Sequence, residues 1–121
     1  MARAAPQFIE DGQSGAALRE RLLLRALKTA EGEDRPRAYE QLANFWVVKK
    51  RTPEAFALLE AGAKEEDHSV EIIYILARLH RTEGNPERAD QLLEEAAEAR
   101  PDDPEVHRVV ASYRARVGDF E

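Results

Sequence analysis

The stretch VEIIYILARLHRTEGNPERADQLLEEAAEARPDD, residues 70–103, decides the fold. On both sides of Gly84-Asn85-Pro86 its apolar residues recur with the period of a helix, and this tripeptide carries turn and helix-start residues. The stretch therefore predicts two short helices joined by a tight turn.

The landmarks of this stretch recur at an interval of 34 residues. The evenly spaced sets are Leu42, Leu76 and Val110; Ala43, Ala77 and Ala111; Ala55 and Ala89; Leu59 and Leu93; and Gly62 and Ala96. A helix–turn–helix unit of this length predicts a solenoid, in which each unit buries its apolar face on its neighbour.

Composition limits the classes of function. The 121 residues suit one small domain, and the formal net charge of −6 argues against a nucleic-acid binder, which would carry a basic face. The chain has no cysteine, and therefore neither disulfides nor a thiolate metal site. Its start does not resemble a secretory signal, and no run approaches the roughly 20 apolar residues that cross a bilayer. We expect a cytoplasmic protein without membrane insertion.

Residues 1–13 are predicted to form an N-terminal arm, and residues 14–35 a capping helix with its loop. Ser14 is a suitable helix cap and Gly32 a suitable end. The apolar stripe of this helix consists of Leu18, Leu22, Leu23, Ala26 and Leu27. Stepping 34 residues back from Ala55 and Leu59 lands on Arg21 and Arg25, which do not suit a packed face. The helix is therefore either a degenerate half-repeat or an unrelated cap.

The repeats are expected at 36–69, 70–103 and 104–121, the last one partial. Gly118-Asp119 follows Gly84-Asn85 by 34 residues, and the sequence ends shortly after it. Either the chain has been cut within a repeat, or its last helix is left for a partner or a second copy to cover.

These residues resemble the tetratricopeptide repeat family over two and a half repeats, residues 36–121. The first repeat supplies Tyr39, Leu42-Ala43, Trp46, Ala55, Leu59, Gly62 and Asp67; the second supplies Ile73, Leu76-Ala77, His80, Ala89, Leu93, Ala96 and Pro101; the third supplies His107, Val110-Ala111 and Arg114. The resemblance implies an all-α, right-handed superhelical α-solenoid of about six helices. It also implies a scaffold or adaptor that binds other proteins and is not an enzyme.

In this family the first helix of each repeat lines a concave groove. By spacing, the groove residues are expected to be Arg37, Glu40, Asn44, Glu71, Tyr74, Arg78, Arg81, Glu105, Arg108 and Ser112, in a row that also includes Val47 and Ala115. Arginine and tyrosine suit peptide recognition. The carboxylate clamp of the chaperone-binding members would fall on Glu40, Asn44, Ile75, Glu105 and Val109, where only Asn44 agrees.

No catalytic, cofactor or metal-binding set stands out. His68, His80 and His107 are far apart, and none has the i, i+4 spacing of a metal-binding helix. A phosphate-binding glycine loop is also missing.

Two functions remain open. The first is a non-catalytic module that binds a peptide or a helix in its groove. The alternative is a structural or assembly protein that self-associates, for example as a homodimer through its C-terminal helix, or a small secretion-type chaperone.

Overall fold

The structure is a computed structural model, and it describes residues 11–65 and 70–117. Within these ranges it has six α-helices and no strand. The helices are α2 (Asp11–Thr29), α3 (Asp34–Val48), α4 (Thr52–Glu65), α5 (Val70–Thr82), α6 (Pro86–Ala99) and α7 (Pro104–Arg116). The predicted all-α class is confirmed.

Side-chain caps start helices α6 and α7. The Asn85 side chain accepts a hydrogen bond from the backbone N–H of Arg88, and the Asp103 side chain accepts one from the N–H of Glu105. A proline follows each cap, at a helical position where its missing N–H is not needed. Residues 1–10, residues 66–69 with Asp67 and His68, and residues 118–121 with Gly118-Asp119 lie outside the described residues.

The turns within the two hairpins are built alike, 34 residues apart. Lys50 has a positive φ of 65° and Gly84 one of 93°. In both turns the next backbone N–H reaches back to a carbonyl of the preceding helix, with Arg51 N bonded to Trp46 O and Asn85 N to His80 O. This is the left-handed ending that commonly closes a helix.

The core follows the constant interval seen in the sequence. Leu42, Leu76, Ala55 and Ala89 are all buried, and Tyr39 lies against the small residue Gly62. The small residues let paired helices approach closely, as in other close-packed interiors. The expected inner positions are therefore confirmed for both complete hairpins.

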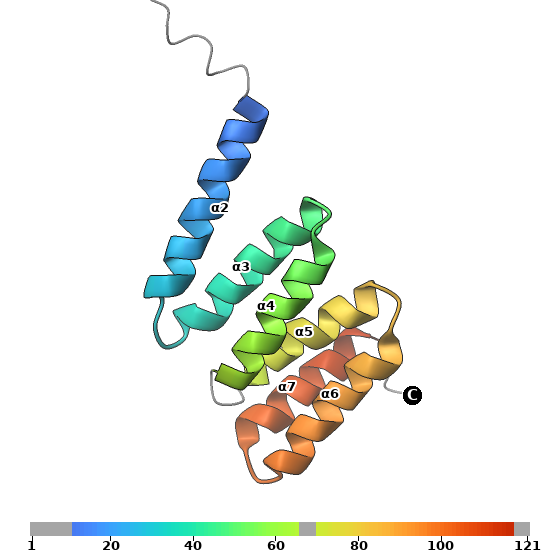
Figure 1. Cartoon of the computed structure of the whole chain (residues 1–121). Helices are drawn as coiled ribbons and strands as arrows, with labels where there is room; N and C mark the ends of the chain where they lie inside the picture. The colour runs from blue at the N-terminus through green and yellow to red at the C-terminus, as the bar shows by residue number, and fades with distance from the viewer. Residues whose placement is uncertain (1–10, 66–69, 118–121) are drawn as a thin grey trace, which may run out of the picture.

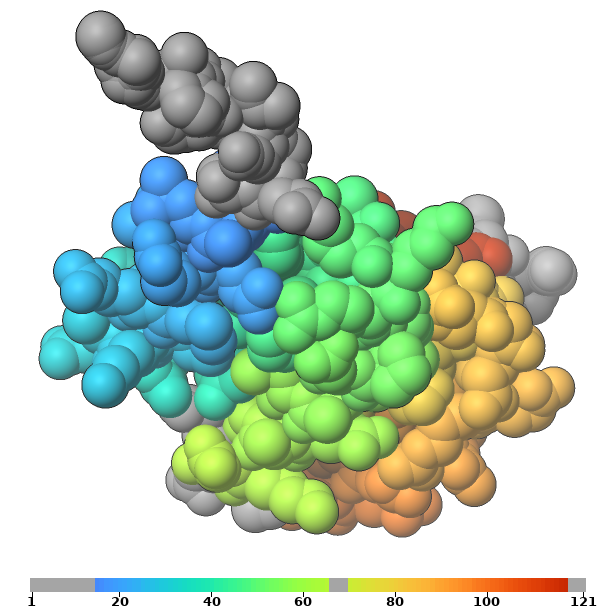
Figure 2. Space-filling model, turned by 45° about the horizontal axis from the view of Figure 1, so that its top comes forward, coloured from blue at the N-terminus to red at the C-terminus, as the bar shows by residue number. Residues whose placement is uncertain are grey.

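The helices stack in chain order (Figure 1). The hairpins α3–α4 and α5–α6 each pack internally, α4 and α6 contact the following helices α5 and α7, and α3, α5 and α7 contact one another in sequence. Helix α2 packs on α3 alone among the described helices. In the space-filling view α2 (blue) forms one end of the molecule and α6 (orange) lies away from it, beyond the green α3 and α4 (Figure 2).

The first described helix differs from the sequence-based expectation in two ways. It begins at Asp11, inside the stretch expected to be an arm, and its apolar stripe is only partly covered. Leu23 and Leu27 are half-buried, whereas Leu18 and Leu22 are 49% and 57% exposed. The reason is that α2 has one neighbour among the described helices, and a single neighbour covers only part of a wide stripe.

Candidate functional site: the groove between the first helices

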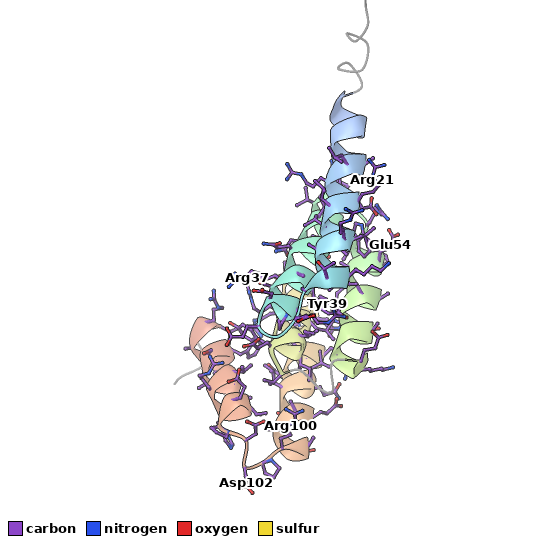
Figure 3. All side chains as sticks on the ribbon, turned by 90° about the vertical axis from the view of Figure 1, so that its left-hand side faces the viewer. Arg21, Arg37, Tyr39, Glu54, Arg100 and Asp102 are labelled. Carbon is purple, nitrogen blue, oxygen red and sulfur yellow. The ribbon has the colours of Figure 1, made fainter. Side chains whose placement is uncertain are left out.

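Helices α3, α5 and α7 line a groove of about 820 Å³. We call it the first-helix groove. Its lining residues are Glu33, Pro36, Arg37, Glu40, Glu71, Tyr74, Ile75, Arg78, Arg108, Val109, Ser112, Ala115 and Arg116. Arg37 and Tyr39 are two residues apart on α3 and point to opposite sides, Arg37 toward α7 and Tyr39 into the hairpin core (Figure 3).

Most of the row expected from spacing lies in this groove. Those residues are Arg37, Glu40, Glu71, Tyr74, Arg78, Arg108 and Ser112. The expected row did not include the apolar floor formed by Ile75 and Val109, although the clamp positions of the chaperone-binding members fall on both residues. It also did not include Arg116, which the i+4 step from Ser112 could have found.

Three expected residues lie elsewhere. Asn44 lines a second hollow, between α2 and α3. Arg81 donates a hydrogen bond of 3.3 Å to the Tyr113 hydroxyl, outside the groove lining. Glu105 accepts a 2.5 Å hydrogen bond from Arg108, so it holds a lining residue without lining the groove itself.

Ion pairs cross the groove from one first helix to the next. Arg78 of α5 lies 3.5 Å from a Glu40 oxygen of α3, and Arg108 of α7 lies 3.9 Å from a Glu71 oxygen of α5. All four side chains are partly exposed, with relative accessibilities of 37–61%. Pairs of this kind contribute only about 0–1 kcal/mol, so a ligand carboxylate can replace the protein's own partner at little cost.

Tyr74 is held in place by its neighbours. Its hydroxyl accepts a 2.9 Å hydrogen bond from Arg116, and the Arg78 guanidinium lies 5.6 Å from its ring centroid. Its ring also meets the Tyr113 ring edge to face, with centroids 6.5 Å apart. A fixed aromatic ring loses little conformational freedom when a ligand packs on it.

The Glu71 carboxyl is the titratable group of the groove with a shifted pKa. Burial raises its pKa above the ordinary value, the neighbouring Glu105 raises it further, and Arg108 opposes the shift. Glu71 is therefore easier to protonate than a free glutamate.

Within residues 11–65 and 70–117, no three or more His, Cys, Asp or Glu side chains gather in a way that could hold a metal ion. His80 stacks on Phe56 with ring centroids 4.4 Å apart, and a ring nitrogen of His107 lies 2.7 Å from the carbonyl oxygen of Pro101. No described helix is long and apolar enough to cross a membrane.

Comparison with known families agrees with this geometry. The family model described as "Tetratricopeptide repeat" matches residues 49–113, more than half of the chain, from the turn before α4 to near the end of α7. The chain is a tetratricopeptide repeat protein. No match was found among curated proteins or among solved structures.

Tetratricopeptide repeats generally mediate protein–protein interactions, and the family is typically non-catalytic. Since the family match starts at residue 49, it leaves α2 and α3 outside. Helix α3 is nevertheless joined to the tetratricopeptide array by its packing on α4 and α5.

Proposed function

We propose that the chain is a non-catalytic binding module that receives an extended peptide or a helix of another protein in the first-helix groove. The observation that supports this most is the combination of a fixed aromatic ring, Tyr74, with an apolar floor and a row of arginines. Such a surface offers both packing area and bidentate hydrogen bonds to a peptide.

The groove favours an acidic ligand, although the whole chain is acidic. Its lining contains four arginines and three glutamates. Among the described residues, Arg37 and Arg116 have no carboxylate within ion-pair distance, and they lie on the two outer helices α3 and α7. A peptide with carboxylates would pair with these two arginines and could take over Arg78 and Arg108.

A direct titration tests this preference. We expect a labelled peptide rich in glutamate to bind at least about tenfold more tightly than a lysine-rich peptide of equal length, and the difference to shrink as salt is added. Fluorescence anisotropy at two salt concentrations measures both. Equal affinity for the two peptides would contradict an acidic ligand.

A capture experiment tests the groove itself. The double variant Arg78→Ala/Arg108→Ala removes two lining cations, whereas Arg21→Ala/Lys64→Ala removes two exposed cations outside the groove. We expect the first variant to lose partners that wild type and the second variant both retain. If all three capture the same partners in equal amounts, the groove is not the binding site.

The setting that we propose is the cytoplasm, because the chain contains no cysteine and has no disulfide to protect from a reducing compartment. Assembly with other copies is a second candidate function. It is favoured by the large apolar side chains left exposed at the α2–α3 end of the described array, Leu18, Leu22, Leu24 and Val48.

A further inference from the structure

Another hollow, of about 510 Å³, lies between α4 and α6, the second helices of the two complete hairpins. We call it the second-helix pocket. It shares no lining residue with the first-helix groove. Its volume falls within the range of roughly 300–1,000 Å³ that is usual for pockets that hold small organic molecules. Its lining residues are Glu60, Ala63, Lys64, Val70, Ile73, Leu76, Arg88, Leu92, Glu95, Ala96, Ala99, Arg100 and Val106.

The floor of the second-helix pocket is apolar. Helices α4 and α6 do not contact each other among the described residues, so α5 lies at the bottom of the space between them. Val70 and Leu76 of α5 and Val106 of α7 are buried below the pocket, and the charged lining residues come from α4, α6 and the C-cap of α6. This combination of an apolar floor with a few charged groups is typical of a ligand site.

The preceding hairpin shows which group fills the equivalent space. Stepping 34 residues back from Ile73 and Ala96 gives Tyr39 and Gly62. There the Tyr39 ring lies directly against Gly62 and is only 3% exposed. Ile73 and Ala96 are both half-buried, and both line the pocket. The second hairpin therefore keeps the space of an aromatic ring at a place where its own side chain is aliphatic and shorter.

A cation accompanies the ring in the preceding hairpin. The Arg35 guanidinium lies 5.6 Å from the centroid of the Tyr39 ring. The second-helix pocket is also lined by cations, which are Lys64, Arg88 and Arg100. Cations are attracted to the face of an aromatic ring, so a ligand ring would find in this pocket the same kind of surroundings as Tyr39.

The charged residues favour a ligand that also carries a negative group. The lining contains three basic and two acidic residues. Arg88 lies 3.7 Å from a Glu95 oxygen, and Arg100 lies 3.3 Å from an Asp103 oxygen. Lys64 is exposed and has no carboxylate within ion-pair distance among the described residues. Its ammonium group can therefore form a charge-assisted hydrogen bond with a ligand carboxylate.

We propose that the second-helix pocket binds a small aromatic carboxylate. The ring of the ligand occupies the space that the Tyr39 ring occupies in the preceding hairpin, and its carboxylate pairs with Lys64. The ligand is a free small molecule, because residues of four helices line one hollow of the size that suits such a molecule. This site is separate from the first-helix groove and does not depend on what the groove binds.

Isothermal titration calorimetry of the full chain with naphthylacetate tests this proposal. We expect one saturable site. The neutral analogue naphthylethanol keeps the ring and lacks the charge, so it should bind at least about threefold more weakly.

Filling the pocket from within should block the ligand. The double variant Ile73→Tyr/Ala96→Gly rebuilds the Tyr39–Gly62 pair in the second hairpin. We expect it to weaken naphthylacetate binding at least about tenfold. Ala96→Gly alone is the matched control, because it leaves the pocket open and should bind within about twofold of wild type. The double variant should also melt at a higher temperature than this control, since its new ring fills an empty space.

A charge reversal tests the carboxylate separately. Lys64 and Lys28 are both exposed and both lie in the last turn of their helices, α4 and α2, so Lys64→Glu and Lys28→Glu should both fold. We expect Lys64→Glu to abolish the preference for naphthylacetate over naphthylethanol, and Lys28→Glu to retain it.

Three results would overturn the proposal. The first is the lack of saturable naphthylacetate binding to wild type up to about 1 mM ligand. The second is equal binding by wild type and Ile73→Tyr/Ala96→Gly, which would place the ligand elsewhere. The third is a preference for the acid that survives in Lys64→Glu, which would mean that Lys64 does not hold the carboxylate.

Discussion

Individual small residues set how closely the helices approach. A Cβ atom built on Gly62 would lie 2.6 Å from a ring carbon of Tyr39, and this ring is buried. A distance that short requires the ring or the helix to shift. The same type of residue at Gly15 in α2 has nothing within 4 Å of its Cβ position. Replacing each of these two glycines with alanine should therefore change the free energy of unfolding in opposite directions.

We predict that Gly62→Ala lowers the free energy of unfolding relative to Gly15→Ala by about 1–3 kcal/mol, because overpacking outweighs the gain in helix propensity of about 1 kcal/mol. Gly15→Ala should be neutral or stabilising by up to about 1 kcal/mol. Urea unfolding followed by circular dichroism measures both. Equal stabilisation by the two alanines would mean that Tyr39 can move aside freely.

Lys50 occupies a backbone position that suits glycine. Its φ of 65° lies in the left-handed region, and Gly84, 34 residues later, has the same role. We predict that Lys50→Gly raises the free energy of unfolding by about 0.5–1 kcal/mol, because it removes the strain of a side chain at positive φ. The mirror variant Gly84→Ala should lower it by a similar amount, about 1 kcal/mol. A loss of stability in Lys50→Gly would show that the lysine makes a contact worth more than this strain.

At the scale of the element, α2 depends on one carboxylate. Glu20 accepts a 3.1 Å hydrogen bond from the indole N–H of Trp46 and a 3.0 Å hydrogen bond from Arg51, which joins α2 to the end of the α3 helix and the turn after it. These hydrogen bonds, first the one from Arg51 and then the one from Trp46, lower the pKa of Glu20 below its ordinary value. The contribution of Glu20 to stability is therefore present above the pKa of the unfolded chain and is lost as pH falls through the lowered pKa.

We predict that α2 detaches in acid, as pH falls through the lowered pKa of Glu20, before the rest of the array unfolds. Trp46 is the single tryptophan of the chain, so its fluorescence reports this step directly. Glu20→Gln should show the fluorescence emission of the detached state already at pH 7. Glu31→Gln, an exposed control in the loop after α2, should behave like wild type. Unchanged emission in Glu20→Gln would show that apolar contacts alone hold α2.

At the scale of the molecule, α5 is the centre of the array. It contacts α3, α4, α6 and α7, whereas α2 contacts α3 only, as far as the described residues go. In a repeat array stability is close to a sum of units and interfaces, so the helix with the most interfaces should open last.

We predict the slowest amide hydrogen exchange in α5 and the fastest in α2 at low protein concentration. Hydrogen exchange with mass spectrometry resolves the two helices. If the amides of α2 exchanged as slowly as those of α5 in dilute solution, stability would not be a sum of units and interfaces.

The sequence predicted the fold well because the residues that become buried recur at a constant interval. The positions of Leu42, Leu76, Ala55 and Ala89 follow from one interval, and all four are buried. It predicted α2 less well, because the 34-residue interval does not extend to this helix: stepping back from Ala55 and Leu59 lands on Arg21 and Arg25, whereas Leu23 and Leu27 are half-buried.

The candidate site was only partly accessible from spacing. The interval places Tyr74 and Arg108 in the groove, but it cannot say which arginines find carboxylates. That depends on how the first helices are staggered, which brings Glu40 to Arg78 and leaves Arg37 without an acidic partner among the described residues. The interval also could not distinguish Glu105, which only accepts a hydrogen bond from Arg108, from the residues that line the groove.

The contact between Tyr39 and Gly62 has a consequence for how this sequence can change over generations. At the corresponding positions of the next hairpin the chain has Ile73, which is smaller than tyrosine, and Ala96, which is larger than glycine. The two positions are therefore epistatic, and the order of substitution matters. The ring must be lost before the methyl group is gained, so a lineage that tries the alanine first meets a fitness barrier that the reverse order avoids.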